Sequence, residues 1–140
     1  MNIEIEKVEI FDALHRLSAN FGIKLQASEI VASTEDDEER IHPLWNDAVT
    51  ELAGLLSPYC IVNDAGDRVV FVLEMPDNWK NSCIGNLVAQ CKAFLSNALF
   101  ARWLDAVKPD SAALYRALNK NFVAAIEQLM SLRTKPIRTV

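Results

Sequence analysis

The chain has 140 residues, a length that suits one domain built around one hydrophobic core. Apolar residues make up 51% of it and charged residues 24%, and with only four glycines and five prolines this composition excludes a disordered, collagen-like or linker-rich chain. The formal net charge of −5 disfavours a general nucleic-acid binder, because such proteins neutralise phosphates with Lys and Arg. It equally disfavours a membrane-surface protein, which needs a basic polar face.

The sequence shows no targeting signal and no cysteine motif typical of redox or metal sites. No apolar run approaches the roughly 18–20 residues of a spanning helix. Residues 1–6 alternate acidic and apolar without the basic and apolar regions of a signal peptide, so we expect an intracellular protein. The three cysteines, Cys60, Cys83 and Cys91, include no C-x-x-C pair, and we expect buried free thiols rather than a redox or metal site.

The first helix is predicted over residues 8–21. Its apolar residues recur three or four positions apart, which is typical of an amphipathic helix, and Gly22 stands where such a helix ends. The alternation of Ile3 and Ile5 with acidic residues is too short to predict a strand, and residues 24–34 are interpreted as a loop.

A second helix is predicted to end at Leu56, before Ser57 and Pro58. Ser33 and Thr34 precede five acidic residues, an arrangement that favours a helix N-terminus because unpaired N–H groups and the helix dipole attract oxygen and negative charge. Pro43 places the expected start near residue 41, with the proline in the first turn. The acidic run lacks the alternate ligands and central glycine of an EF-hand, so we expect no calcium there.

A β-hairpin is predicted at about 59–75. Residues 59–62 and 68–73 are rich in β-formers and flank a turn, in which Gly66 is expected to adopt a left-handed conformation. Turn chemistry explains Asp64 and Asp67 without a catalytic role.

Two long helices complete the prediction. The first opens at Pro76 and runs for about 30 residues to Val107. Pro109 breaks it, Ser111 caps the second, and the short connection predicts antiparallel packing. We therefore expect a mainly α fold, a helical bundle of about four helices with one inserted β-hairpin and a long antiparallel C-terminal helix pair. Residues 1–133 form the single domain and 134–140 a basic extended tail.

Motifs that carry chemistry are missing. The sequence contains no phosphate-binding glycine loop and no G-x-S-x-G elbow, and His15 and His42 have no partner at catalytic or metal-ligand spacing. The tryptophans Trp45, Trp79 and Trp103 fall on apolar helical stripes, which favours core positions. We expect no catalytic, cofactor-binding or metal-binding residues. The positive charges of Arg102 and Lys108 are interpreted as interacting favourably with the dipole at the C-terminal end of their helix.

The tail carries the candidate partner-binding residues, Arg133, Lys135, Pro136 and Arg138. Their positive charge suits an acidic partner, and a proline that cannot continue a helix suits an extended segment laid along a partner surface. The alternative is a solvated, frayed terminus, the commoner fate of terminal residues.

The order of these elements resembles a known family. The acidic-capped helix with the sequence DDEERI…LWNDA (36–48), then the hairpin, then PDNW (76–79) opening a long helix resemble the head–tail connector (adaptor or completion) proteins of tailed bacteriophages and prophages. The segment 99–133 is similar to small structural proteins of phages from gut bacteria. The resemblance covers roughly residues 8–133, and the long last helix departs from the shorter one that is common in the family.

This resemblance implies a non-enzymatic ring subunit that connects the portal of the head to the tail. Its partners would be copies of itself in a homo-oligomeric ring, the portal and tail-completion proteins, with no membrane and no sequence-specific nucleic acid. It would be found in the virion, and in the bacterial cytoplasm during assembly. Acidic charge suits a channel along which DNA slides. Two alternatives stay open: a helical protein–protein interaction module, such as a regulatory adaptor or inhibitor, and a small enzyme with a site assembled from scattered residues.

Overall fold

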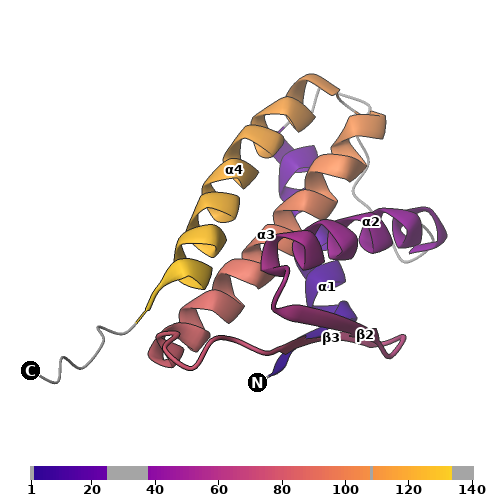
Figure 1. Cartoon of the computed structure of the whole chain (residues 1–140). Coiled ribbons are helices and arrows are strands. Elements are labelled where there is room, and N and C mark those ends of the chain that lie inside the picture. Colours follow the sequence, from indigo (N-terminus) through magenta and orange to yellow (C-terminus); the bar gives the residue numbers. More distant parts are fainter. Residues whose placement is uncertain (1, 25–37, 108, 134–140) are drawn as a thin grey trace, which may run out of the picture.

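A computed structural model describes residues 2–24, 38–107 and 109–133 (Figure 1). The elements follow in the order β1 (Asn2–Glu6), α1 (Lys7–Lys24), α2 (Glu38–Leu56), β2 (Cys60–Asp64), β3 (Arg68–Leu73), a short 3-10 helix η2 (Asn81–Cys83), α3 (Ile84–Val107) and α4 (Pro109–Ser131). The expected mainly helical fold, with an inserted hairpin and a C-terminal helix pair, is confirmed.

The sheet has three antiparallel strands in the order β1-β3-β2, so the hairpin gains a third strand from the chain's beginning. In the register, Phe71 of β3 faces Ile3 on one side and Val62 on the other. Alternate residues of β1 and β3 are buried against the helices while those between them face solvent. This is the pattern of an antiparallel sheet with one covered face.

The hairpin turn is held by the residues that the sequence assigned to turn chemistry. Gly66 has φ +91°, and its N–H donates to Asp64 Oδ1 at 2.8 Å. The N–H of Ala65 donates to the carbonyl of Arg68 at 2.9 Å, which closes the turn, and the carbonyl of Asp67 accepts from the N–H of Lys7 at 2.9 Å. The turn thereby fixes the start of α1 as well as the hairpin.

Gly66→Ala is expected to lower the free energy of unfolding by about 1 kcal/mol, because a Cβ is disfavoured at positive φ. Gly54→Ala is the matched control, since Gly54 lies inside α2 and an added Cβ there meets no atom within 4 Å. The control should raise stability by up to about 1 kcal/mol through helix propensity. Urea unfolding measures both changes, and equal losses in the two variants would contradict the turn geometry.

Helix α3 forms the centre of the molecule. It packs along α4 and against α2 and α1, and in Figure 1 it runs between α4 and α2, with α1 behind it. Because neighbours surround it, its buried residues occupy most of its circumference: Leu87, Cys91, Phe94, Leu95, Asn97, Ala98, Leu99, Phe100, Ala101, Trp103 and Leu104. The antiparallel pairing of the last two helices is confirmed.

Two helix boundaries differ from the prediction near the N-terminus. Helix α1 continues through Gly22 to Lys24, so this glycine does not end it. Helix α2 begins at Glu38 and contains Pro43 in its interior rather than in its first turn. The predicted capping residues Ser33 and Thr34 lie outside the described residues.

The start of the long third helix was also predicted wrongly. Residues 76–79 form a turn, in which the N–H of Trp79 donates to the carbonyl of Pro76 at 2.9 Å, and α3 begins only at Ile84. Trp79 is buried, but beside the end of α4 and not on a helical stripe. Pro109 separates α3 from α4 as predicted, yet it is itself the first residue of α4, a position that tolerates proline well.

Candidate interaction surfaces

The C-terminal end of α4 is fixed by Trp79, which lies 50 positions before Leu129 in the sequence, and by Arg133, which follows the helix. The indole Nε1 of Trp79 donates to the carbonyl of Leu129 at 2.9 Å, and the backbone of Trp79 forms an antiparallel bridge with Arg133. The guanidinium of Arg133 donates to the carbonyls of Met130 and Leu132, both at 2.9 Å. These bonds satisfy carbonyls that a helix end leaves free.

Of the four predicted partner-binding residues, only Arg133 lies within the described part of the chain. It is exposed, and its guanidinium already bonds the end of its own helix. Lys135, Pro136 and Arg138 lie outside the described residues, so their contact with a partner stays a prediction.

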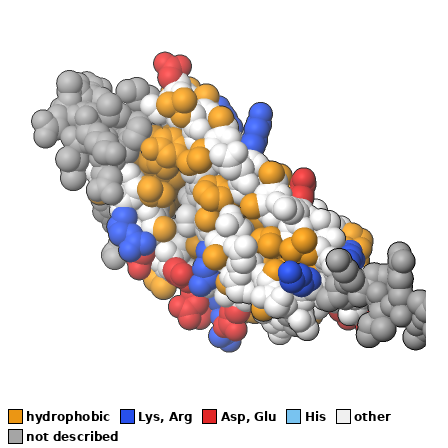
Figure 2. Space-filling model, turned by 90° about the vertical axis from the view of Figure 1, so that its left-hand side faces the viewer, with side chains coloured by type: hydrophobic (Ala, Val, Ile, Leu, Met, Phe, Trp, Pro, Cys, Tyr) orange, Lys and Arg blue, Asp and Glu red, His pale blue; other side chains and the backbone are white. Residues whose placement is uncertain are grey.

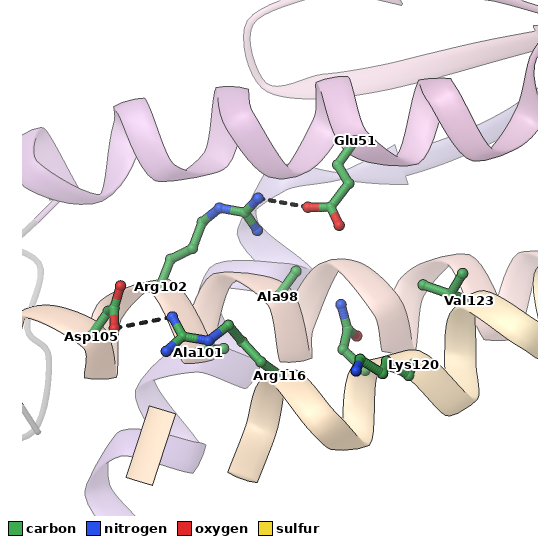
Figure 3. A pocket seen from close by; sticks show the side chains of 9 residues that line it. Glu51, Ala98, Ala101, Arg102, Asp105, Arg116, Lys120 and Val123 are labelled. Carbon is green, nitrogen blue, oxygen red and sulfur yellow. Dashed lines mark hydrogen bonds and ion pairs between the residues drawn. The ribbon is translucent and has the colours of Figure 1, made fainter. Parts of the chain in front are cut away.

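A polar groove of about 430 Å³ opens between α2, α3 and α4. Two ion pairs cross it, as Figure 3 shows. Arg102 Nη2 of α3 lies 2.6 Å from Glu51 Oε2 of α2, and Arg116 Nη1 of α4 lies 3.0 Å from Asp105 Oδ1 of α3. Arg102 therefore pairs with a carboxylate of another helix, which the sequence did not predict, and Lys108 lies outside the described residues.

Two residues of this polar groove carry unused hydrogen-bonding capacity. Asn119 is buried in its wall, and its Oδ1 has no hydrogen-bond partner within the described ranges. Lys120, on the rim, is exposed and makes no ion pair with any described side chain. The neighbouring buried amide of Asn97, by contrast, donates from Nδ2 to the carbonyl of Tyr115 at 2.8 Å. The polar groove is thus suited to a polar or negatively charged segment.

Strand β2 exposes two large apolar side chains. Ile61 of β2 is 65% exposed and lies opposite Val72 of β3, which is half-buried. Val62 is 37% exposed, although it pairs with the buried Phe71. Strand β2 pairs only with β3 among the described strands, so the backbone of one of its edges is open. We call β2 with this open edge the β2 edge.

A second exposed apolar surface follows α4. Leu114 is 71% exposed, and Leu118 lies one helical turn further along. Figure 2, which faces the side of the molecule where α4 lies, shows hydrophobic side chains distributed along this side, with charged side chains between and around them. Single exposed leucines are common on helices, so this surface by itself carries little meaning.

The thiols and histidines give no reactive centre. Burial, and next the nearby thiol of Cys60, raise the pKa of Cys91 from 9.0 to about 12. Burial also raises the pKa of Cys60, and Cys83 donates from Sγ to the carbonyl of Lys80 at 2.9 Å. His42 is exposed, and its Nε2 lies 2.8 Å from Lys7 Nζ. No three His, Cys, Asp or Glu side chains in the described ranges are grouped to hold a metal ion.

We expect Cys91 to react with a thiol reagent at about pH 8 at least 100 times more slowly in the folded chain than in urea, because the buried thiol stays protonated. The raised pKa also has a stability consequence. Between pH 9.0 and about 12 the unfolded chain loses this proton and the folded chain keeps it, so stability falls as pH rises through that window. Cys91→Ala should make the decline less steep. Equal reaction rates for all three thiols of the folded chain would contradict this assignment.

Comparisons with models of protein families, with characterised proteins and with solved structures found no match for this chain. Among the described helices, none combines the length and hydrophobicity needed to cross a membrane. The chain is a mainly helical domain with a small antiparallel sheet, and its polar groove and β2 edge are the features that bear on its function.

Proposed function

We propose that the chain is a non-enzymatic assembly subunit that binds other proteins through the β2 edge. The single observation that carries this proposal is Ile61, a large apolar side chain left 65% exposed on a strand that has no partner on its outer edge among the described strands. An unpaired strand offers a row of N–H and C=O groups to an incoming strand, and its side chains give the contact specificity.

The β2 edge lacks the devices that usually protect edge strands. Proteins commonly place Lys, Pro or a bulge on an open edge, which discourages pairing with another chain. Strand β2, with the sequence CIVND, contains no proline and no basic residue, and its register with β3 is regular over all five residues. Val72 extends the apolar surface beside Ile61 on the same face of the sheet, and Val62 points to the opposite face. The edge is thus suited to addition of a strand from another subunit.

The assembly that we propose is the head–tail connector of a tailed phage or prophage. The support for this step is the order of elements: an acidic helix, a hairpin, and a long helix pair that folds back on itself. A net charge of −5 agrees with it, because subunits around a DNA channel should avoid lasting contacts with phosphates. The contacts between subunits would be head-to-tail and close into a ring, with the portal and tail-completion proteins as its neighbours in the virion.

The polar groove favours a second candidate, a helical interaction module that acts as a regulatory adaptor or inhibitor. The buried amide of Asn119 and the ammonium of Lys120, which makes no ion pair with a described side chain, are suited to a polar segment of a partner lying between the last two helices. This candidate requires a one-to-one complex with a protein that is not part of a phage, and Lys120→Glu should weaken that complex.

Sedimentation velocity tests the proposed function. The partner is the portal protein encoded in the DNA that flanks this gene, and the sequence of that DNA supplies it. The proposal predicts that the chain co-sediments with the portal at a ratio of several subunits to one portal ring. Flanking genes without portal, capsid or tail proteins would overturn the phage assignment, and sedimentation of the two proteins as separate species would overturn the assembly.

A further inference from the structure

Apart from the polar groove, a cavity of about 380 Å³ lies between the end of β3 and the start of η2. Its apolar wall contains Met75 and Pro76, both half-buried, and its exposed rim carries the carboxylates of Glu74 and Asp77. Neither carboxylate forms an ion pair with a described residue. The remaining lining residues are Leu73, Trp79 and Asn81. We call this cavity the acidic groove.

The described part of the chain ends directly beside the acidic groove. Arg133 forms an antiparallel bridge with Trp79, which lines the groove, and the N–H of Lys80 donates to the carbonyl of Leu132 at 3.3 Å. Seven further residues, 134–140, follow in the sequence. A segment of that length reaches at most about 23 Å, which is ample for a groove that begins at the residue paired with Arg133.

The chemistry of this segment complements the acidic groove. Its sequence, TKPIRTV, places Pro136 and Ile137 between two basic residues, Lys135 and Arg138. The groove has an apolar wall between two acidic side chains, and the segment is an apolar pair between two cations. A short tether also raises the effective concentration of the segment near the groove to the millimolar range, so weak contacts are enough to keep it bound there.

We propose that the acidic groove binds residues 134–140 of the same chain. Pro136 and Ile137 meet the apolar wall, while Lys135 and Arg138 pair with the carboxylates on the rim. The basic tail is then a segment held by its own domain, and an external partner has to compete for it. This proposal does not depend on the connector function or on the β2 edge.

Trypsin cleavage after Arg138 of the full chain tests the proposal. The double variant Glu74→Gln/Asp77→Asn removes both rim charges while it keeps side-chain size, and Asp12→Asn is the matched control, because Asp12 is an exposed acidic residue of α1. Mass spectrometry follows the cleavage rate under dilute trypsin, where the rate reports the fraction of free tail. We expect the double variant to be cleaved about three to ten times faster than the wild type and the control, the range for two exposed ion pairs.

The dependence of the cleavage rate on protein concentration distinguishes a tail bound within its own chain from a tail bound to a second copy. Binding within one molecule predicts cleavage rates that do not change over a hundredfold dilution. Equal rates in the wild type, the double variant and the control would overturn the proposal. Protection that disappears on dilution would also overturn it, because the tail would then occupy the groove of another copy.

Discussion

Trp79→Ala is expected to lower the free energy of unfolding by about 3–5 kcal/mol, the range for removing a buried aromatic side chain. Trp79 is only 4% exposed, and its indole bonds the carbonyl of Leu129, 50 positions away. It therefore joins the turn before α3 to the end of α4, and its loss leaves a cavity and removes the shortest hydrogen bond that the Leu129 carbonyl accepts. Urea unfolding of the purified variant measures the change.

Trp79→Phe separates the two contributions. This variant keeps most of the apolar volume but removes the N–H donor, so we expect a smaller loss of about 1–3 kcal/mol. A loss below about 1 kcal/mol in the alanine variant would contradict the placement of Trp79 in the core, and equal losses in the two variants would show that packing contributes little there.

Ile61→Lys is expected to weaken binding to the assembly partner at least about hundredfold, because a central apolar anchor is replaced by a charge that needs water. The stability of the isolated chain should change by no more than about 0.5 kcal/mol, since Ile61 is 65% exposed. Sedimentation with the portal measures the first effect and urea unfolding the second.

Leu114→Lys provides the matched control for this variant. Leu114 is an equally large apolar residue, 71% exposed, and it lies on α4, away from the sheet (Figure 1). It should leave binding unchanged. Equal weakening by both substitutions, or none by Ile61→Lys, would show that the β2 edge is not the binding surface.

The helices and the hairpin were predictable because their signals are local. Apolar residues at helical spacing mark α2 and α4, and Gly66 between two β-rich runs marks the hairpin. Strand β1 was missed because five residues of alternation carry little signal alone. Its partner β3 lies more than 60 positions away, where Ile3 pairs with Phe71. A strand that exists through such a distant pairing is visible only in the fold.

The start of α3 shows a local pattern overridden by tertiary contacts. The helical spacing of Trp79 with Cys83 and Leu87 predicted one continuous helix from Pro76. In the structure the hydrogen bond of Trp79 to Leu129 and its antiparallel bridge with Arg133 hold these residues in a turn, and α3 starts at Ile84. The energy of burying one tryptophan exceeds the small preference of a few residues for helix.

The candidate surfaces were the least predictable part. The polar groove depends on residues far apart in the chain, such as Glu51 and Arg102, that meet only because α2 crosses α3. The exposure of Ile61 depends on its position in an edge strand, since its partner Val72 on the central strand is half-buried. The sequence pattern predicted Arg133, Lys135, Pro136 and Arg138 as the partner-binding site, and of these only Arg133 lies within the described residues.

An electron cryomicroscopy reconstruction of the chain mixed with its portal tests the central claim most directly. The account predicts a closed ring of subunits seated on the portal, in which Ile61 and the outer edge of β2 are buried against a neighbouring protein. A portal ring without bound subunits, or a complex in which the β2 edge faces solvent, would contradict it.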